Sequence, residues 1–376
     1  MKYYYLDHAA TTPLDPRVLE HMMPYMNDLY GNPSSMHQKG IEVKRDINIA
    51  RESIANLFDI EPEGVIFTSG GTEATNLAIR GTALMNKEKH TIITTRIEHH
   101  ATLNTVHKLE KEGYKIVYLN VDHEGFIDLV ELETTITNET LMLSIILGNN
   151  EIGTLQNIEM IGKICQRNNI LLHVDAVQMV QYKKLSMRDL SIDLLTLSAH
   201  KFYGPKGIGA LLVKNRSILE PIIYGGHQEK GLRSGTENVY GIVGMAKALL
   251  LAHQERKVRV THLQKLTQTL MTQMKQAIPD VVYNGPKEDS YRIPGLLSLS
   301  FPDVDGQALL FSLNQRGIYV STGSACQANE ATSSHVLRAI HMDRGYGTIR
   351  ISFGQDNNVD DIDDIVAIFK SVYEDI

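Results

Sequence analysis

Polar and basic side chains follow an apolar run in the stretch LTLSAHKFYGPKGIGALLV, residues 195–213. Ser198, His200 and Lys201 stand where that run ends, and a glycine-containing turn and a second apolar run come next, which predicts strand, turn and strand. Open α/β sheets keep their binding sites at the carboxyl ends of their strands, so these side chains are candidates for a catalytic site. The alternative is an ordinary strand end whose polar residues face water.

An acid stands at the end of a second predicted strand. The run LLHVDAVQ, residues 171–178, places Asp175 after an apolar segment and Gln178 one short turn later. Pyridoxal phosphate needs a lysine amine that holds its aldehyde carbon and an acid that keeps its ring nitrogen protonated. Asp175 and Lys201 on two strand ends therefore predict this cofactor, although Asp175 is also a candidate N-cap for a helix that follows it.

The stretch FTSGGTEATNLAI, residues 67–79, offers a place for a phosphate group. It predicts a strand that passes through Gly70 and Gly71 into a helix beginning near Thr72. Backbone N–H groups at such a turn bind an anion, and the glycines let it approach closely. Two glycines are common in turns of this kind, but no P-loop lysine and no G-x-G-x-x-G run competes for the role.

Two adjacent histidines follow a further predicted strand in the stretch IEHHATL. His99 and His100 lack partners at the spacing of metal ligands, so we predict no metal site. An imidazole stacked on a flat cofactor ring, where it can move protons, is one interpretation. A pair of surface histidines is the other.

The two cysteines lie in contrasting surroundings. Cys165 belongs to the helical, apolar run IEMIGKICQRNN, whereas Cys326 lies among small and polar residues in VSTGSACQANEATSSHVLRAI. A cysteine in a polar loop is accessible for reaction, so Cys326 is a candidate nucleophile. Near the end of the chain, GTIRISFG places Arg350 in an apolar strand, where its guanidinium needs either a structural acid or the carboxylate of a substrate.

Helical and strand patterns alternate from about residue 50 to 215, which predicts an α/β fold with a mostly parallel sheet. After about residue 250 the pattern changes to that of a smaller α+β unit. We expect a large domain over residues 15–255 and a small one built from residues 1–14 and 256–376. A long amphipathic helix, residues 245–278, crosses this boundary.

Composition excludes several classes of function. The 376 residues carry a formal net charge of −7, so no basic surface for nucleic acid is expected. The longest apolar runs are too short to span a bilayer, and the first residues show no export signal. Two cysteines do not make a disulfide framework, and all of this predicts a cytoplasmic protein.

Taken together, the motifs resemble those of the NifS/IscS-type cysteine desulfurases of the class V aminotransferase family. The shared runs are YLDHAATTP, GNPSS, FTSGGTEATNLAI, IEHHA, GNNEIGT, HVDAVQ, SAHKFYGPKGIGALLV, RSGTENV, GSAC and IRISFG. The resemblance covers nearly the whole chain. It implies a fold type I homodimer that binds pyridoxal phosphate on Lys201, with Asp175 at the ring nitrogen and His99 stacked on the ring.

The same resemblance assigns the remaining contacts. Asn150 and Gln178 are implied at the ring hydroxyl, and the phosphate contacts are implied for Gly71, Thr72, Ser198, His200 and, from the other subunit, Thr236. Arg350, with Asn32 of GNPSS nearby, is implied to hold the substrate carboxylate. Val336 follows Cys326 by ten residues, as in members with a long cysteine loop. His100 stands where many members carry lysine.

The activity that the resemblance implies converts L-cysteine to L-alanine and leaves the sulfur as a persulfide on Cys326. A protein acceptor, either a tRNA-thiolating enzyme or an iron–sulfur scaffold, is expected to receive it. A selenocysteine lyase or another class V lyase or transaminase would use the same cofactor residues with less need of Cys326. A non-enzymatic scaffold for sulfur-handling partners would leave Lys201 unmodified.

Overall fold

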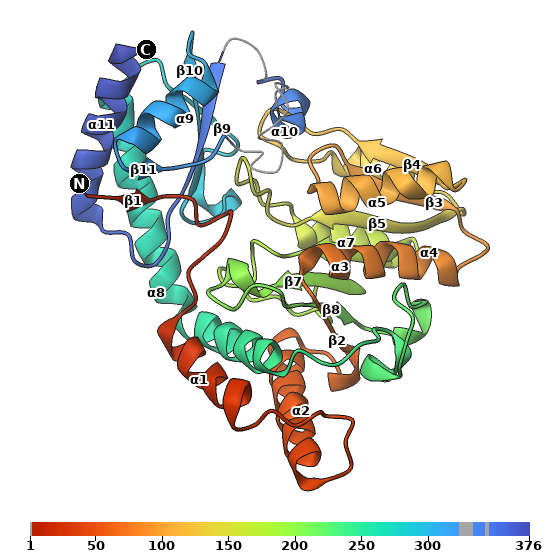
Figure 1. The fold of residues 1–376 in the computed structure, drawn as a ribbon. Coiled ribbons are helices and arrows are strands. Elements are labelled where there is room, and N and C mark those ends of the chain that lie inside the picture. The colour runs from red at the N-terminus through yellow and green to blue at the C-terminus, as the bar shows by residue number, and fades with distance from the viewer. Residues whose placement is uncertain (1, 323–333, 343–345) are drawn as a thin grey trace.

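The computed structural model describes residues 2–322, 334–342 and 346–376. A seven-stranded sheet forms its centre, with the strand order β2-β8-β7-β6-β5-β3-β4 (Figure 1). The strands are β2 (Val65–Thr68), β3 (Thr91–Thr95), β4 (Lys115–Leu119), β5 (Thr140–Ile146), β6 (Leu171–Asp175), β7 (Leu194–Ser198) and β8 (Gly209–Val213). Neighbours from β7 to β4 pair in parallel, and β8 runs antiparallel to both β2 and β7. The predicted mostly parallel α/β sheet is confirmed.

Both faces of this sheet are buried, which explains why its central strands are apolar throughout. One face packs against residues of α2 (Gln38–Phe58), α7 (Ile158–Arg167) and the first half of α8 (Val239–Ala277). The other face packs against α3 (Gly71–Asn76), the π-helical turn Leu77–Gly81, α4 (Thr82–Met85) and α5 (His100–Lys111). Two further helices complete this part: α1 (Pro16–Asn27) and α6 (Leu129–Thr135).

A second hydrophobic cluster belongs to the remaining elements. An antiparallel sheet has the order β12-β10-β9, and a short parallel pair joins β1 (Tyr4–Tyr5) to β11 (Ile318–Tyr319). The other elements are β9 (Val282–Asn284), β10 (Leu296–Pro302), α9 (Gly306–Gln315), β12 (Tyr346–Ser352) and α11 (Ile362–Asp375). The short helix α10 (His335–Ala339) packs instead against Ile97 and Ile152 of the large part. The first residues of the chain therefore lie with its last third, and Figure 1 shows both termini beside α11.

Helix α8 connects the two clusters, as the predicted long helix should. Its residues Ile242 to Leu251 belong to the core of the large sheet, and Leu263 to Met274 belong to the second core. One continuous helix of 39 residues thus holds the two parts in a fixed relation. Among the described residues, no helix combines the length and apolarity that crossing a membrane requires.

Candidate functional site

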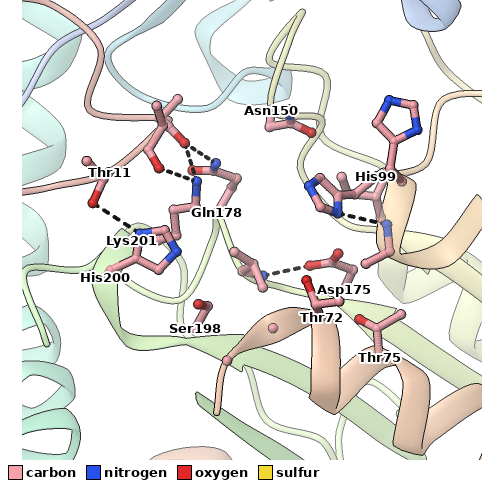
Figure 2. A pocket seen from close by; sticks show the side chains of 18 of the residues that line it. Thr11, Thr72, Thr75, His99, Asn150, Asp175, Gln178, Ser198, His200 and Lys201 are labelled. Atoms are coloured by element: carbon pink, nitrogen blue, oxygen red, sulfur yellow. Dashed lines mark hydrogen bonds between the residues drawn. The ribbon is translucent and has the colours of Figure 1, made fainter. Parts of the chain in front are cut away.

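A cavity of about 590 Å³ opens where β5, β6 and β7 end. Parallel strands present their carboxyl ends at one edge, so side chains from distant parts of the sequence meet there. Figure 2 shows many of them pointing into this space. The predicted site residues that line the cavity are Gly71, Thr72, His99, Asn150, Asp175, Gln178, Ser198, His200, Lys201 and Arg350.

Three predicted site residues are not among those lining it. Asn32 lies in the loop before α2, is exposed, and accepts a hydrogen bond from the backbone N–H of Ser34. Thr236 is exposed, in the loop before α8. Cys326 lies outside the described residues. Their assigned roles stay predictions.

Lys201 belongs to the short 3-10 turn Ala199–Lys201 that follows β7. Its Nζ donates hydrogen bonds to the backbone oxygens of Ala9, at 2.6 Å, and Ala10, at 2.8 Å (Figure 2). Because one short turn joins this lysine to a buried strand, its backbone is fixed. The structure thus aims an amine at the cavity from a rigid base.

Asp175 is the last residue of β6 and is 6% exposed. Its Oδ1 accepts a hydrogen bond from the backbone N–H of Val177 at 3.0 Å. This is a capping bond, but turns and not a helix follow it, so the helix N-cap alternative does not hold. Burial raises the pKa of Asp175 to about 6, although the charge of Lys201 opposes the increase. A carboxylate in this setting favours a cationic partner.

His99 is the N-cap of α5. Its Nδ1 accepts a hydrogen bond from the backbone N–H of Ala101 at 3.1 Å, so Nδ1 carries no proton and the neutral ring is protonated at Nε2. Burial lowers the pKa of His99 to about 4, and the charge of Lys201 lowers it further. His100 lies beside His335 of α10, with ring centroids 4.8 Å apart. The histidine pair is therefore not a plain surface feature.

The turn between β2 and α3 forms a recess beside Ser198. A Cβ on Gly71 would lie 3.1 Å from Val177 Cγ2 and 3.4 Å from the Cβ of Ser198, so a side chain there would crowd this wall. His200 lines the same cavity, and its Nδ1 lies 3.1 Å from Thr11 Oγ1. Burial lowers the pKa of His200 to about 4. Helix α3 starts at Gly71, one residue before the predicted start.

Arg350 of β12 is 2% exposed, and its partner within this chain is an acid. Its Nη2 lies 2.7 Å from Asp7 Oδ1, and its Nη1 donates a hydrogen bond to the backbone oxygen of Asn150 at 3.0 Å. A planar guanidinium with five donors is suited to bidentate binding of a carboxylate. Asp7 thus orients an arginine at the rim of the cavity.

Sequence reasoning missed the segment that covers one side of the cavity. Ala9, Ala10 and Thr11 line it, and the backbone oxygen of Ala9 accepts hydrogen bonds from both Lys201 and Gln178. The run of small residues in YLDHAATTP could have indicated this segment, because it lacks the spacing of apolar residues that is typical of a strand or a helix. Glu98 and Glu151 also line the cavity and were missed, since single acids in loops carry no pattern.

The residues present fit pyridoxal phosphate. A rigid lysine, a buried acid with a raised pKa and a neutral imidazole surround one cavity, and a glycine turn with a serine and a histidine lies at its edge. These are the groups that hold the aldehyde carbon, the ring nitrogen, the ring face and the phosphate of that cofactor.

Comparisons with known proteins give one consistent picture. Residues 4–365 match the family model "Aminotransferase class-V". The chain is 43% identical over 374 residues to a protein named "Cysteine desulfurase IscS" from Clostridium botulinum, which covers 99% of this chain and 94% of that protein. It is also 43% identical over 367 residues to "Putative cysteine desulfurase IscS 1" from Bacillus subtilis, with 96% of each chain covered.

Solved structures are similar to this chain over nearly its whole length. A structure titled "NIFS-LIKE PROTEIN" covers 100% of both chains, with a TM-score of 0.93 and 37% identity. A second, titled "SspA in complex with cysteine", covers 93% of this chain and 98% of that one, with a TM-score of 0.80 and 35% identity.

Proposed function

The chain belongs to the class V aminotransferase family, and we propose that it is a cysteine desulfurase that converts L-cysteine to L-alanine and passes the sulfur to Cys326. The observation that carries the proposal is the cavity in which Lys201, Asp175 and His99 meet, in a chain similar over its length to cysteine desulfurases. The test is incubation with L-cysteine and a thiol reductant. Equal amounts of alanine and sulfide support the proposal, and pyruvate or a transaminated keto acid in place of alanine contradicts it.

The cofactor of this family is pyridoxal 5′-phosphate, which when bound withdraws the electrons released from the substrate Cα. In the proposal Lys201 holds it and then takes the Cα proton. Asp175 keeps the ring nitrogen protonated, His99 packs on the ring, and Asn150 and Gln178 contact the ring hydroxyl. The phosphate is bound by four residues: Gly71, Thr72, Ser198 and His200.

Arg350 binds the carboxylate of cysteine, with Asn150 and Asn32 as further substrate contacts. The Cys326 thiolate attacks the substrate sulfur, so that an S–S bond forms while the Cβ–S bond of the substrate breaks. The electron pair of the broken bond stays with the substrate carbon, which takes up a proton and becomes alanine. The persulfide on Cys326 is then passed to a protein acceptor, either a tRNA-thiolating enzyme or an iron–sulfur scaffold.

The assembly forms part of the same proposal. The chain acts as a cytoplasmic homodimer in which Thr236 of the partner subunit reaches the phosphate. The exposure of Thr236 and its absence from the lining of the cavity in its own chain support this. Residues 15–255 make the cofactor-binding domain, and 1–14 with 256–376 make the small domain, a division that the two hydrophobic clusters support. No observation favours the selenocysteine lyase.

Asp175→Asn should lower turnover by at least about 100-fold, because an amide does not keep the ring nitrogen protonated. The same change should stabilise the protein without cofactor. The pKa of Asp175 is raised from its ordinary value of 3.8 to about 6 in the folded state, so the wild type loses stability as pH rises between these values. At pH 8 the variant should therefore unfold with a free energy larger by on the order of 1–3 kcal/mol.

Urea denaturation of both apoproteins at pH 4.5 and pH 8 measures this difference. The gain should be small at pH 4.5, where the wild-type carboxyl is already protonated, and full at pH 8. A stability gap that does not change with pH, or wild-type turnover in the variant, would show that Asp175 is a capping residue and no more.

Asp7→Asn should raise the KM for cysteine by about 10- to 100-fold with a smaller change in kcat. The reason is that Arg350 loses the charged hydrogen bond that orients it, which is worth on the order of 1.5–3 kcal/mol. Asp361→Asn, which removes an exposed ion pair with Lys2, is the matched control and should leave KM unchanged. Equal KM values for Asp7→Asn and the wild type would remove Asp7 from the substrate site.

A further inference from the structure

Glu98 is a buried carboxyl group at the cavity that the proposed reaction does not use. It lies between β3 and α5, lines the cavity and is 1% exposed. Its Oε1 accepts a hydrogen bond from Thr95 Oγ1 at 2.6 Å. Its Oε2 is buried and has no partner within hydrogen-bond distance among the described residues, although the backbone N–H of Ile146 faces the carboxyl group and lowers its pKa. A charged carboxylate with an unsatisfied oxygen so far from water is costly, whereas a carboxylic acid is tolerated.

The charges around Glu98 favour the acid form. Burial raises the pKa of Glu98 to about 8, although the hydroxyl of Thr95 and the backbone N–H of Ile146 oppose the increase, and the negative charge of Asp175 on β6 adds to it. His99 follows Glu98 in the chain and is itself held neutral by burial, and the ring of His335 donates to the backbone of Glu98 and not to its carboxyl group. Burial raises the pKa of Asp175 only to about 6, so Asp175 loses its proton before Glu98 does as the pH rises.

Glu98 also closes the turn that places His99. The side chain of Glu98 reaches back to Thr95 at the end of β3, while its backbone oxygen accepts a hydrogen bond from His335 Nε2 at 2.9 Å. Asn149 Nδ2 donates to the backbone oxygen of Ile97 at 2.8 Å. Glu98 is thus fixed at both its side chain and its backbone, and it holds the next residue, His99, in place as the N-cap of α5.

We propose that Glu98 is an uncharged carboxylic acid in the resting site and acts as a positioning residue. It holds the turn before His99 and leaves the negative charge of the carboxyl pair on Asp175, where the ring nitrogen binds. This deepens the proposed function and rests on it for the roles of His99 and Asp175. The protonation itself is a property of the protein alone, so its measurement stands even if the enzyme has another activity.

Infrared titration of the full-length protein, freed of cofactor and carrying glutamate ¹³C-labelled at the side-chain carboxyl, tests the proposal. At pH 6.5 we expect the carbonyl band of a protonated carboxylic acid, shifted by the label because it comes from glutamate. The band should disappear with a midpoint near pH 8, the folded pKa of Glu98. Asp175→Asn should move that midpoint to lower pH, because it removes the neighbouring negative charge.

Two variants assign the band. Glu151 is the other glutamate whose pKa is raised by burial among the described residues, and Ser334 donates a hydrogen bond to it. Glu98→Gln should abolish the component that responds to Asp175, whereas Glu151→Gln should retain it. The proposal is overturned if no labelled band is present at pH 6.5 in Glu151→Gln, a result that holds even if Glu98→Gln does not fold.

The affinity for the cofactor distinguishes a positioning role of Glu98 from a side chain that only fills space. Glu98→Ala should weaken the affinity for pyridoxal phosphate by about 10-fold, because the turn loses its contact with Thr95 and one neutral hydrogen bond is worth on this order. Glu98→Gln, which is uncharged and keeps an acceptor for Thr95, should restore most of that affinity. If Gln binds as weakly as Ala, Glu98 acts as an anion and the proposal is wrong.

Discussion

Lys201→Ala is expected to abolish covalent attachment of pyridoxal phosphate and to lower the rate of alanine formation by about 10⁴-fold or more. The structure gives two reasons. Lys201 is the amine whose Nζ is held at the cavity by Ala9 and Ala10. In the proposed function it also takes the Cα proton, so its loss removes two steps at once. Visible absorption and the mass of the borohydride-reduced protein measure attachment, and amino-acid analysis measures alanine.

Lys214→Ala is the matched control, since Lys214 directly follows β8 as Lys201 closely follows β7, but is exposed and away from the cavity. It should bind cofactor and turn over as the wild type does. A Lys201→Ala protein that still carries reducible, covalently bound cofactor would contradict the assignment. A colourless wild type that stays colourless with added cofactor would contradict the proposed function as a whole.

Cys326→Ser should lose sulfide and alanine production by at least about 100-fold while retaining cofactor and binding cysteine. A serine hydroxyl has the same size but is a far poorer nucleophile toward sulfur than a thiolate. Cys326 is separate from the cofactor residues in the proposed mechanism, so the change in visible absorption on adding cysteine should persist. Rates of alanine and sulfide formation, measured beside that spectral change, distinguish lost sulfur transfer from lost binding.

Cys165→Ser provides the internal comparison. Cys165 is 1% exposed within α7, and burial raises the pKa of its thiol to about 12, so it forms no thiolate at neutral pH. This variant should turn over at a rate close to that of the wild type. Wild-type alanine production by Cys326→Ser would refute the proposed sulfur transfer.

The sheet and its strand ends could be predicted because they are local features. A buried parallel strand is a short apolar run, and the polar residue that ends it marks the edge of the sheet, as Asp175 and Ser198 do. The helix after Gly71 shows the limit of such patterns. Its sequence is that of one regular helix, but residues 77–81 form a π-helical turn. There the backbone oxygen of Glu220 packs so closely that a Cβ on Gly81 would lie 2.7 Å from it.

Contacts between residues that are far apart in the sequence could not be predicted from the sequence. Asp7 and Arg350 are 343 positions apart, and nothing near either residue shows that they pair. The same holds for Ala9, which accepts a hydrogen bond from Lys201 across 192 positions, and for Glu98, whose pKa is raised mainly by burial. The sequence pattern identifies which side chains end strands, whereas the cover of the cavity and the protonation of its acids depend on tertiary packing.

In the proposed function, the sulfur of cysteine is transferred to Cys326. The most direct measurement is mass spectrometry of the protein after brief exposure to L-cysteine, followed by alkylation and peptide mapping. We predict one added sulfur atom on the peptide that contains Cys326, none on the peptide with Cys165, and none anywhere in Lys201→Ala. Alanine formed in the first turnover without added sulfur on Cys326 would contradict the account.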